Sequence, residues 1–120
     1  MKSLILIVLW CFFSWSAYAK TPSAVAQEIE YLIEKVEHSE CSFHRNGKSH
    51  DAIQAADHLR LKLRRGKKYA DTAEHFIERL ASKSSWTGKS YFLECQPGHL
   101  IEVSPWMKRH LLHYRQRMMR

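Results

Sequence analysis

The stretch Cys41-Ser-Phe-His-Arg-Asn-Gly-Lys-Ser-His50 carries the strongest structural signal in the chain. Its first half alternates between apolar and polar side chains, as a short strand does, and leads into Asn46-Gly47. This dipeptide is favoured at the centre of a two-residue type I′ hairpin because both positions need a positive φ. The predicted hairpin pairs Arg45 with Lys48, so Phe43 lies opposite His50 and shares a face of the sheet with it.

Cys41 also predicts a covalent link to a distant part of the chain. Of the three cysteines, Cys11 lies in the export signal described below, so Cys41 and Cys95 remain in the mature protein. An even pair in an oxidising compartment most simply forms one disulfide, and the long separation differs from the Cys-x-x-Cys spacing of redox-active pairs. The bond would join the hairpin to a strand predicted at residues 90–95, which is followed by a turn at Pro97-Gly98.

Helices are predicted on both sides of the hairpin. Apolar residues at helical spacing between positions 25 and 36 predict the first helix, and Thr21-Pro22 is suited to supply its N-cap and first position. The glutamates on its other faces, Glu28 among them, are expected in solvent. The second helix begins at Asp51, the N-cap of a predicted capping box, and ends in the basic turn of residues 64–68.

Two further helices complete the predicted fold. The third begins at Asp71 or Thr72 and has Glu74 in range as a reciprocal cap. The last is capped by Ser104-Pro105, and the tail from Arg115 onward is expected to fray. The predicted fold class is α+β, with about four helices packed on a short antiparallel sheet that comprises the hairpin and one strand, held by one disulfide.

The first nineteen residues are predicted to be a cleavable signal peptide. Lys2 supplies the positive charge, and an unbroken apolar run follows at residues 4–13. The run is shorter than the ~20 apolar residues that span a bilayer, so no membrane span is expected after cleavage. Small residues at Ala17 and Ala19 suit signal peptidase and place cleavage after Ala19, which makes Lys20 the first residue of the mature chain.

Residues 20–120 have the length of a single domain. Loss of Lys2 lowers the formal net charge from +7 to +6, so the mature chain is basic. Its Lys and Arg residues gather at the end of the second helix and along the last helix, where they either form a solvated face or attract an acidic partner or lipid head groups. Export argues against nucleic acid as a partner. No motif predicts a cofactor.

Eight histidines raise the question of a metal site. His44 and His50 point to opposite faces of the predicted hairpin. His110 and His113 lie three residues apart on the last helix, but no Cys, Asp or Glu lies beside them to complete a tetrahedral site. No metal site is therefore predicted. A local nucleophile motif such as Gly-x-Ser-x-Gly is also absent from the sequence, so no catalytic residue is assigned.

Four motifs follow one another along the chain: Phe43-His-Arg-Asn-Gly47, Ala56-Asp-His-Leu-Arg-Leu-Lys-Leu63, Asp71-Thr-Ala-Glu74 with Phe76-Ile77, and Ser84-Ser-x-Thr-Gly-Lys-x-Tyr91. In this order they resemble the YfeK-like family, small exported bacterial proteins that carry a domain of unknown function. The resemblance covers nearly the whole mature chain. It implies a periplasmic location in a Gram-negative bacterium and no particular activity.

The family motifs direct attention to a set of polar residues, of which His58 and Lys62 lie one helical turn apart at the edge of the core. One interpretation is a hydrogen-bond network that fixes the hairpin and the serine loop against the helices, because partly buried polar groups need partners. The other is a pocket for an anionic or carbonyl-bearing ligand. The candidate residues are Arg45, Asn46, His58, Lys62, Glu74, Ser84, Ser85 and Tyr91.

We therefore expect a monomeric periplasmic binding or interaction module of the cell envelope rather than an enzyme. Its partner would be an envelope protein or an anionic glycan or lipid. The alternative is a small hydrolase or transferase that uses His58 with Ser84 or Ser85. The two differ in geometry, because catalysis needs serine and histidine within hydrogen-bonding distance in a concave pocket.

Overall fold

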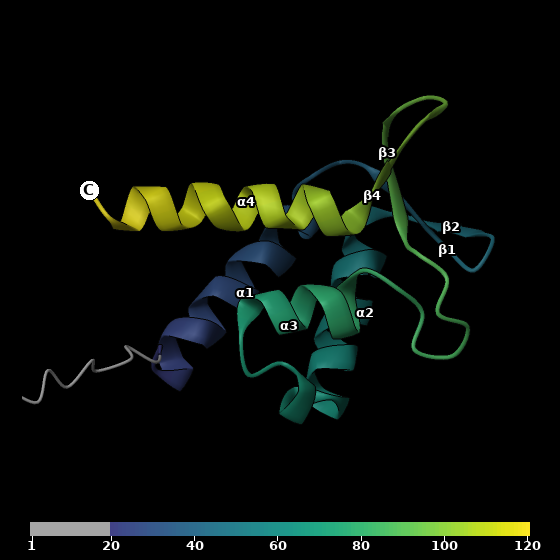
Figure 1. Cartoon of the computed structure of the whole chain (residues 1–120). Helices are drawn as coiled ribbons and strands as arrows, with labels where there is room; N and C mark the ends of the chain where they lie inside the picture. Colours follow the sequence, from purple (N-terminus) through teal and green to yellow (C-terminus); the bar gives the residue numbers. More distant parts are fainter. Residues whose placement is uncertain (1–19) are drawn as a thin grey trace, which may run out of the picture.

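The computed structural model describes residues 20–120, and the predicted signal peptide at residues 1–19 lies outside them. Helices and strands alternate in blocks along this part of the chain, with the sheet at one side of the helices (Figure 1). In order, the elements are α1 (Pro22–Glu37), β1 (Ser42–Arg45), β2 (Lys48–His50), α2 (Ala52–Arg65), the 3-10 turn η1 (Lys67–Tyr69), α3 (Ala73–Phe76), the π-helix η2 (Ile77–Ala81), β3 (Phe92–Gln96), β4 (His99–Glu102) and α4 (Val103–Met118).

Four antiparallel strands form one sheet in the order β2-β1-β3-β4. The β1–β2 hairpin has the predicted register, with Arg45 opposite Lys48 and Phe43 opposite His50. In the centre of the sheet Phe43 also lies opposite Leu93 of β3, and both side chains are buried. The α+β fold class is therefore confirmed, with the helices packed on the face of the sheet that carries these two residues.

A disulfide between Cys41 and Cys95 joins the two central strands, as predicted. Cys41 immediately precedes β1 and is buried, whereas Cys95 lies in β3 and is exposed. The bond extends the β1–β3 pairing by one step, because Ser42 already lies opposite Glu94.

The fourth strand is an addition to the predicted sheet. β4 pairs with β3 through Ile101 opposite Leu93 and Leu100 opposite Glu94. Its residues do not show a clean alternation of burial, since His99 and Leu100 are both exposed at the edge of the sheet. The turn at Pro97-Gly98 therefore connects two strands instead of ending the sheet.

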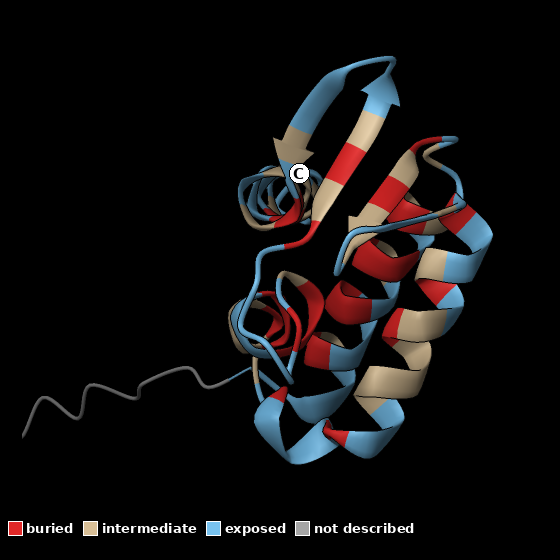
Figure 2. Ribbon diagram, turned by 90° about the vertical axis from the view of Figure 1, so that its right-hand side faces the viewer, coloured by how far each residue is buried: buried red, intermediate tan, exposed pale blue. Residues whose placement is uncertain are grey.

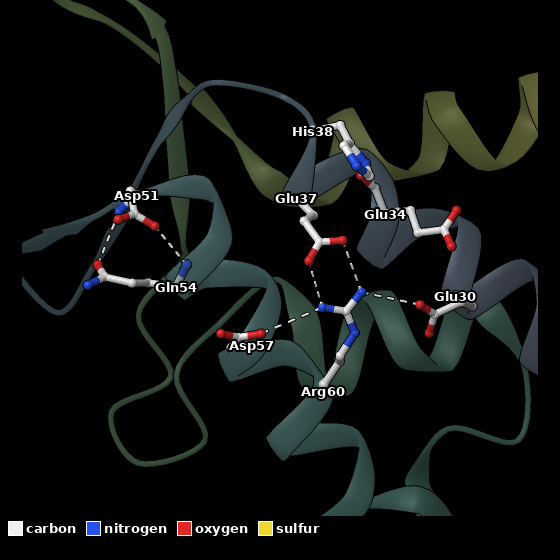
Figure 3. Close-up of polar contacts among 8 residues, drawn as sticks. All are labelled: Glu30, Glu34, Glu37, His38, Asp51, Gln54, Asp57 and Arg60. Carbon is white, nitrogen blue, oxygen red and sulfur yellow. Dashed lines mark hydrogen bonds and ion pairs between the residues drawn. The ribbon is translucent and has the colours of Figure 1, made fainter.

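The predicted starts of the first two helices are confirmed. Thr21 caps α1 by accepting a hydrogen bond from the amide of Ala24 at 3.2 Å. Asp51 and Gln54 form the reciprocal capping box of α2, which Figure 3 shows. α2 ends at the predicted breaker, Gly66, whose amide donates to the carbonyl of Lys62.

The third helix differs from an ordinary α-helix in its second half. α3 begins after Thr72, whose hydroxyl accepts a hydrogen bond from the amide of His75 at 3.0 Å. The chain then widens into η2 at Ile77. The apolar residues that the sequence places at helical spacing are buried through both segments; they are Ala73, Phe76, Ile77, Leu80 and Ala81. Glu74 does not cap this helix reciprocally, because its carboxylate pairs with Arg115 of α4.

The core lies where the helices meet one another and the sheet (Figure 2). Figure 2 shows buried residues on these inner faces, while the tip of the β3–β4 hairpin is exposed. The largest fully buried side chains come from helices and strands alike; they are Phe76, Leu32, Ile33, Ile77, Leu93, Met107, Val36 and Val103. Within residues 20–120, no helix combines the length and the apolar character needed to cross a membrane.

Arg60 ties α2 to α1 through carboxylates (Figure 3). Its guanidinium lies 3.1 Å from Glu37 and 3.3 Å from Glu30, both on α1. Asp57, one turn earlier on α2, lies 3.6 Å away. The hydrogen bonds with Glu37 raise the pKa of Arg60 above its ordinary value and lower the pKa of Glu37. The charge of Arg60 is thus neutralised within the fold, although Arg60 is one of the cations that gather towards the end of the second helix.

Glu28 is 3% exposed, so the expectation that it faces solvent is wrong. Its carboxylate accepts hydrogen bonds from Arg115 Nε and from Lys20 Nζ, each at 2.6 Å. Arg115 also pairs with Glu74, so one guanidinium joins α4 to both α1 and α3. The helix is ordered beyond this residue, to Met118, which corrects the predicted fraying from Arg115.

The start of α4 also differs from the prediction. The helix begins at Val103, and Glu102 occupies its N-cap position without a side-chain hydrogen bond. Ser104 and the proline after it therefore lie inside the first turn and do not cap the helix. The cause is the sheet: β4 ends at Glu102, and the amide of Val103 donates to the carbonyl of Tyr91 at 3.0 Å.

Removing the disulfide is expected to destabilise the fold without changing it. In the chain-entropy model, a loop of this length makes a Cys41→Ala, Cys95→Ala double variant less stable by about 4 kcal/mol. Urea unfolding at pH 7 would measure this as a lower midpoint with a steeper slope, because the unfolded chain without the cross-link exposes more surface. Two free thiols in the native protein would contradict the disulfide outright.

The ion pair at Glu28 predicts a dependence of stability on pH. Burial opposes ionisation of Glu28, but the hydrogen bonds from Arg115 and Lys20 outweigh it and hold the pKa below the ordinary 4.5. The stabilisation is therefore present above about pH 4.5 and is lost as the pH falls through the lowered folded pKa. Arg115→Met should lower the free energy of unfolding by about 3 kcal/mol at pH 7, because it leaves a buried carboxylate short of a partner.

The same variant should lose progressively less relative to the native protein as the pH falls through the lowered folded pKa of Glu28, because protonation of the carboxylate removes the ion pair. Arg109→Met is the matched control, because Arg109 is exposed on the same helix and forms no ion pair within residues 20–120. Equal losses for the two variants at pH 7 would show that the ion pair does not stabilise the fold.

Candidate functional site

A broad open concavity of about 980 Å³ lies beside the β1–β2 hairpin, between α2 and the loop of residues 82–91. We call it the basic concavity, because within the described chain its lining contains Lys and Arg but no Asp or Glu. Figure 1 shows the hairpin tip and the loop projecting on the same side of the molecule. The cationic side chains of the lining are Arg45, Lys48, Lys62, Arg65, Arg79 and Lys83.

The strand register explains why these segments meet. Because β1 and β3 run antiparallel, the end of β1 at Arg45 lies beside the residue that precedes β3, Tyr91. The hairpin turn after Arg45 must therefore lie next to the loop that leads into Tyr91. The loop is closed by its own backbone, since the amide of Tyr91 donates to the carbonyl of Ser82 at 2.8 Å and that of Ser84 to Lys89 at 2.9 Å.

Asn46 joins the hairpin to the loop. It adopts a φ of 51° at the first turn position, followed by Gly47 at 78°. Its side-chain amide donates to Ser84 Oγ at 3.3 Å, and its carbonyl oxygen accepts from Thr87 Oγ1 at 3.0 Å. Ser84 Oγ also accepts from the amides of Trp86 and Thr87, each at 3.3 Å. Asn46 and Ser84 thus take part in the fold-supporting network, which is one of the two interpretations of the candidate residues.

Lys62 lies within the concavity on α2. Its ammonium donates to the carbonyl of Lys83 at 3.0 Å and to the hydroxyl of Tyr91 at 3.2 Å. No carboxylate lies within 4.0 Å of it in residues 20–120. Burial, followed by the positive charge of Arg45, lowers the pKa of Lys62 to about 8. The charged form of Lys62 is therefore destabilised by desolvation, and its two neutral hydrogen-bond acceptors offset this only in part.

His58 lies one turn before Lys62 and is half-buried. Burial, together with nearby positive charges of which Arg45 is the largest, lowers the pKa of His58 to about 4. The imidazole is consequently neutral at pH 7, and its Nε2 atom is buried without a hydrogen-bond partner in the described chain. Such strongly shifted groups in a concavity are typical of functional sites, although structural networks also shift pKa values.

The residues of the catalytic alternative lie in the same concavity but are not coupled to each other. Within the described chain no hydrogen bond joins His58 to Ser84 or Ser85. Ser84 is buried and its oxygen already accepts three hydrogen bonds, which leaves it a poor nucleophile. Ser85 is exposed on the rim.

Seven of the eight candidate residues line the basic concavity, and Glu74 is the exception because it pairs with Arg115. The histidines of the hairpin lie on opposite faces of the sheet, as the register requires. His44 lies 3.7 Å from Glu94, and no group of three potential metal ligands occurs in residues 20–120.

Several lining residues are absent from the candidates derived from the sequence. Trp86 is 97% exposed at the tip of the loop, and Tyr69 is 48% exposed where η1 ends. The sequence contains a signal for the first of these, since Trp86 is an isolated aromatic residue in a polar run of Ser, Lys and Thr. For Arg65, Arg79 and Tyr69 there is no such signal, because their convergence depends on how α2 packs against η2.

Comparison with known proteins assigns a family but no activity. A model of a family of unknown function, DUF5329, matches residues 23–115. The uncharacterized protein YfeK of Salmonella typhimurium is 35% identical over 92 residues, which are 76% of this chain and 77% of that protein. No solved structure matches the chain. The family predicted from the motifs is confirmed.

The turn conformation and the side-chain bonds of Asn46 can be separated experimentally. Asn46→Gly keeps a residue that adopts positive φ readily but removes the two hydrogen bonds to the loop. We expect a loss of about 1 to 2 kcal/mol in the free energy of unfolding and faster amide hydrogen exchange at residues 84–88. Ser49→Gly, on the same hairpin, is the control; equal exchange in both variants would show that Asn46 does not hold the loop.

Proposed function

This chain belongs to the family of unknown function DUF5329, and we propose that it is an exported binding protein whose basic concavity holds an anionic ligand of the cell envelope. The observation that carries the proposal is the set of cations that converge without counter-ions. Arg45, Lys48, Lys62, Arg65 and Lys83 have no carboxylate within 4.0 Å in residues 20–120. A bound anion would supply the missing charge.

The rest of the fold argues that this arrangement is not a general consequence of a basic sequence. Arg60 and Arg115 each have at least two carboxylate partners. In the concavity, by contrast, Arg45 bonds through its guanidinium to His50 at 3.2 Å. Repulsion among nearby cations destabilises the free protein. A bound anion would relieve this repulsion, and the relief would add to the free energy of binding.

The cell envelope follows from the predicted export and is compatible with the disulfide, which persists in oxidising compartments. We propose that residues 1–19 are removed after Ala19 and that the mature protein is a periplasmic monomer. Candidate partners are an anionic glycan, an anionic lipid or an acidic surface of an envelope protein. No observation favours the alternative hydrolase or transferase, because the concavity lacks a serine–histidine pair at hydrogen-bonding distance in the described residues.

Lys62 distinguishes a binding pocket from a structural network. Lys62→Met removes a half-buried charge together with two hydrogen bonds, so we expect the free energy of unfolding at pH 7 to change by less than about 1 kcal/mol. The affinity for linear polyphosphate, measured by isothermal titration calorimetry, should fall about tenfold or more. Lys67→Met is the matched control, since Lys67 lies outside the lining.

A purely structural Lys62 would give the opposite pattern, with marked destabilisation and unchanged polyphosphate affinity.

Binding of polyphosphate should also depend on pH. The pKa of Lys62 is about 8, so its positive charge is lost as the pH rises from about 7 to 9. Polyphosphate affinity should fall over this range in the native protein and less steeply in Lys62→Met, provided that the ionic strength is constant.

A further inference from the structure

The basic concavity carries exposed aromatic rings that an inorganic anion does not need. Trp86 is 97% exposed at the tip of the loop, and Tyr69 is 48% exposed after the end of α2. Both line the concavity, although they come from different segments of the chain. One of them, Tyr69, has the ammonium of Lys68 at 5.0 Å from its ring centre.

The exposure of Trp86 is not a consequence of a loose backbone. Its amide donates to Ser84 Oγ, and Ser84 is itself bonded to Asn46 of the hairpin. The backbone is therefore pinned while the indole contributes no buried area to the core. An exposed indole costs hydration free energy, which a ligand that covers the ring would recover. Because the backbone is already held, only the side-chain torsions of Trp86 lose conformational entropy on binding.

From this combination we propose that the ligand is an acidic glycan, an oligosaccharide that carries carboxylate or phosphate groups. A sugar ring presents an apolar C–H face that stacks on an aromatic ring, while its acidic groups match Lys62 and the neighbouring cations. The proposal rests on the proposed anion-binding function and assigns the chemical class of its ligand. Trp86 and Tyr69 would hold sugar rings at the rim of the concavity, and Lys62 would bind an acidic group within it.

Size and lining favour a glycan over the other anionic partners. The volume of about 980 Å³ is at the upper end of ordinary ligand pockets and far exceeds a single phosphate. Leu61 and Leu80 are the only aliphatic side chains of the lining in the described chain, whereas its cations and exposed rings match the two parts of an acidic sugar. A flat lipid surface would also meet the rim cations without reaching the half-buried ammonium of Lys62.

The test compares ligands of matched charge on the full mature chain. Hexagalacturonate has a carboxylate on every sugar, linear polyphosphate of equal charge has no sugar ring, and maltohexaose has rings but no charge. Affinities are measured by isothermal titration calorimetry for the native protein, Trp86→Ala and Ile53→Ala. Ile53 is the control, because it is a large apolar residue that is 61% exposed outside the concavity.

We expect hexagalacturonate to bind about tenfold tighter than polyphosphate, and maltohexaose to bind at least tenfold more weakly than hexagalacturonate. Trp86→Ala should weaken hexagalacturonate about tenfold and leave polyphosphate unchanged, whereas Ile53→Ala should change neither. Because Trp86 is exposed, its replacement should also leave the thermal midpoint unchanged, which shows that any loss is not due to unfolding.

Three outcomes would overturn the inference. Equal affinity for the two anions, with no effect of Trp86→Ala, would show that the site recognises charge and not sugar rings. This result would contradict the acidic glycan but agree with the proposed anion-binding function. Stronger binding to phosphatidylglycerol vesicles than to hexagalacturonate would identify a membrane surface as the partner. Absence of binding to any of these anions would overturn both the acidic glycan and the anion-binding function.

Discussion

The pairing of β1 with β3 is the constraint on which the rest of the structure depends. The β1–β2 and β3–β4 pairs are local hairpins, whereas β1 and β3 join segments about fifty residues apart, at the loop-closure cost that such a separation implies. The Cys41–Cys95 bond lies one step beyond the paired residues. In the chain-entropy model it already closes this loop in the unfolded chain, so folding loses less loop-closure entropy. Once this register is set, Arg45 and Tyr91 must lie side by side, and the hairpin turn must meet the serine loop.

Two kinds of cation have different surroundings in this small basic protein. Arg60 and Arg115 satisfy carboxylates on neighbouring helices and so hold α1, α2, α3 and α4 together. In the basic concavity, by contrast, Lys62 is partly desolvated and has no such partner in the described chain, and among the other cations of the lining Arg79 alone lies near a carboxylate, 3.8 Å from Asp71. Stability alone would not select an unpaired, half-buried ammonium, because a methionine would fill the same space at a lower electrostatic cost. Groups held at such a cost are expected at sites that bind or react.

Much of the scaffold could be predicted from local sequence. Asn46-Gly47 determines a turn type and hence a register, Asp51 determines a helix start, and periodic apolar residues determine the buried faces. These features depend on neighbours within a few positions, so one chain suffices to find them. The edge strand β4, the start of α4 and the burial of Glu28 were not accessible in this way. β4 and the start of α4 depend on hydrogen bonds with the preceding segment 91–96, and the burial of Glu28 depends on Arg115, far away in the sequence. An exposed edge strand or a glutamate on a helix has no distinctive local pattern that would reveal these contacts.

The same division applies to the candidate site. The sequence by itself determined most of the polar residues that line the concavity and the family to which they belong, because both depend on motifs that are contiguous in the chain. Only the tertiary structure decided that Glu74 points elsewhere, that Arg65 and Arg79 join the cations, and that Trp86 and Tyr69 share the rim. The physical reason is that charge balance and concavity are properties of a surface assembled from α2, η1, η2, the hairpin and the serine loop. A carboxylate on any one of these segments could have neutralised a cation on another. The absence of carboxylates from the lining can therefore be recognised only when all of these segments have been placed.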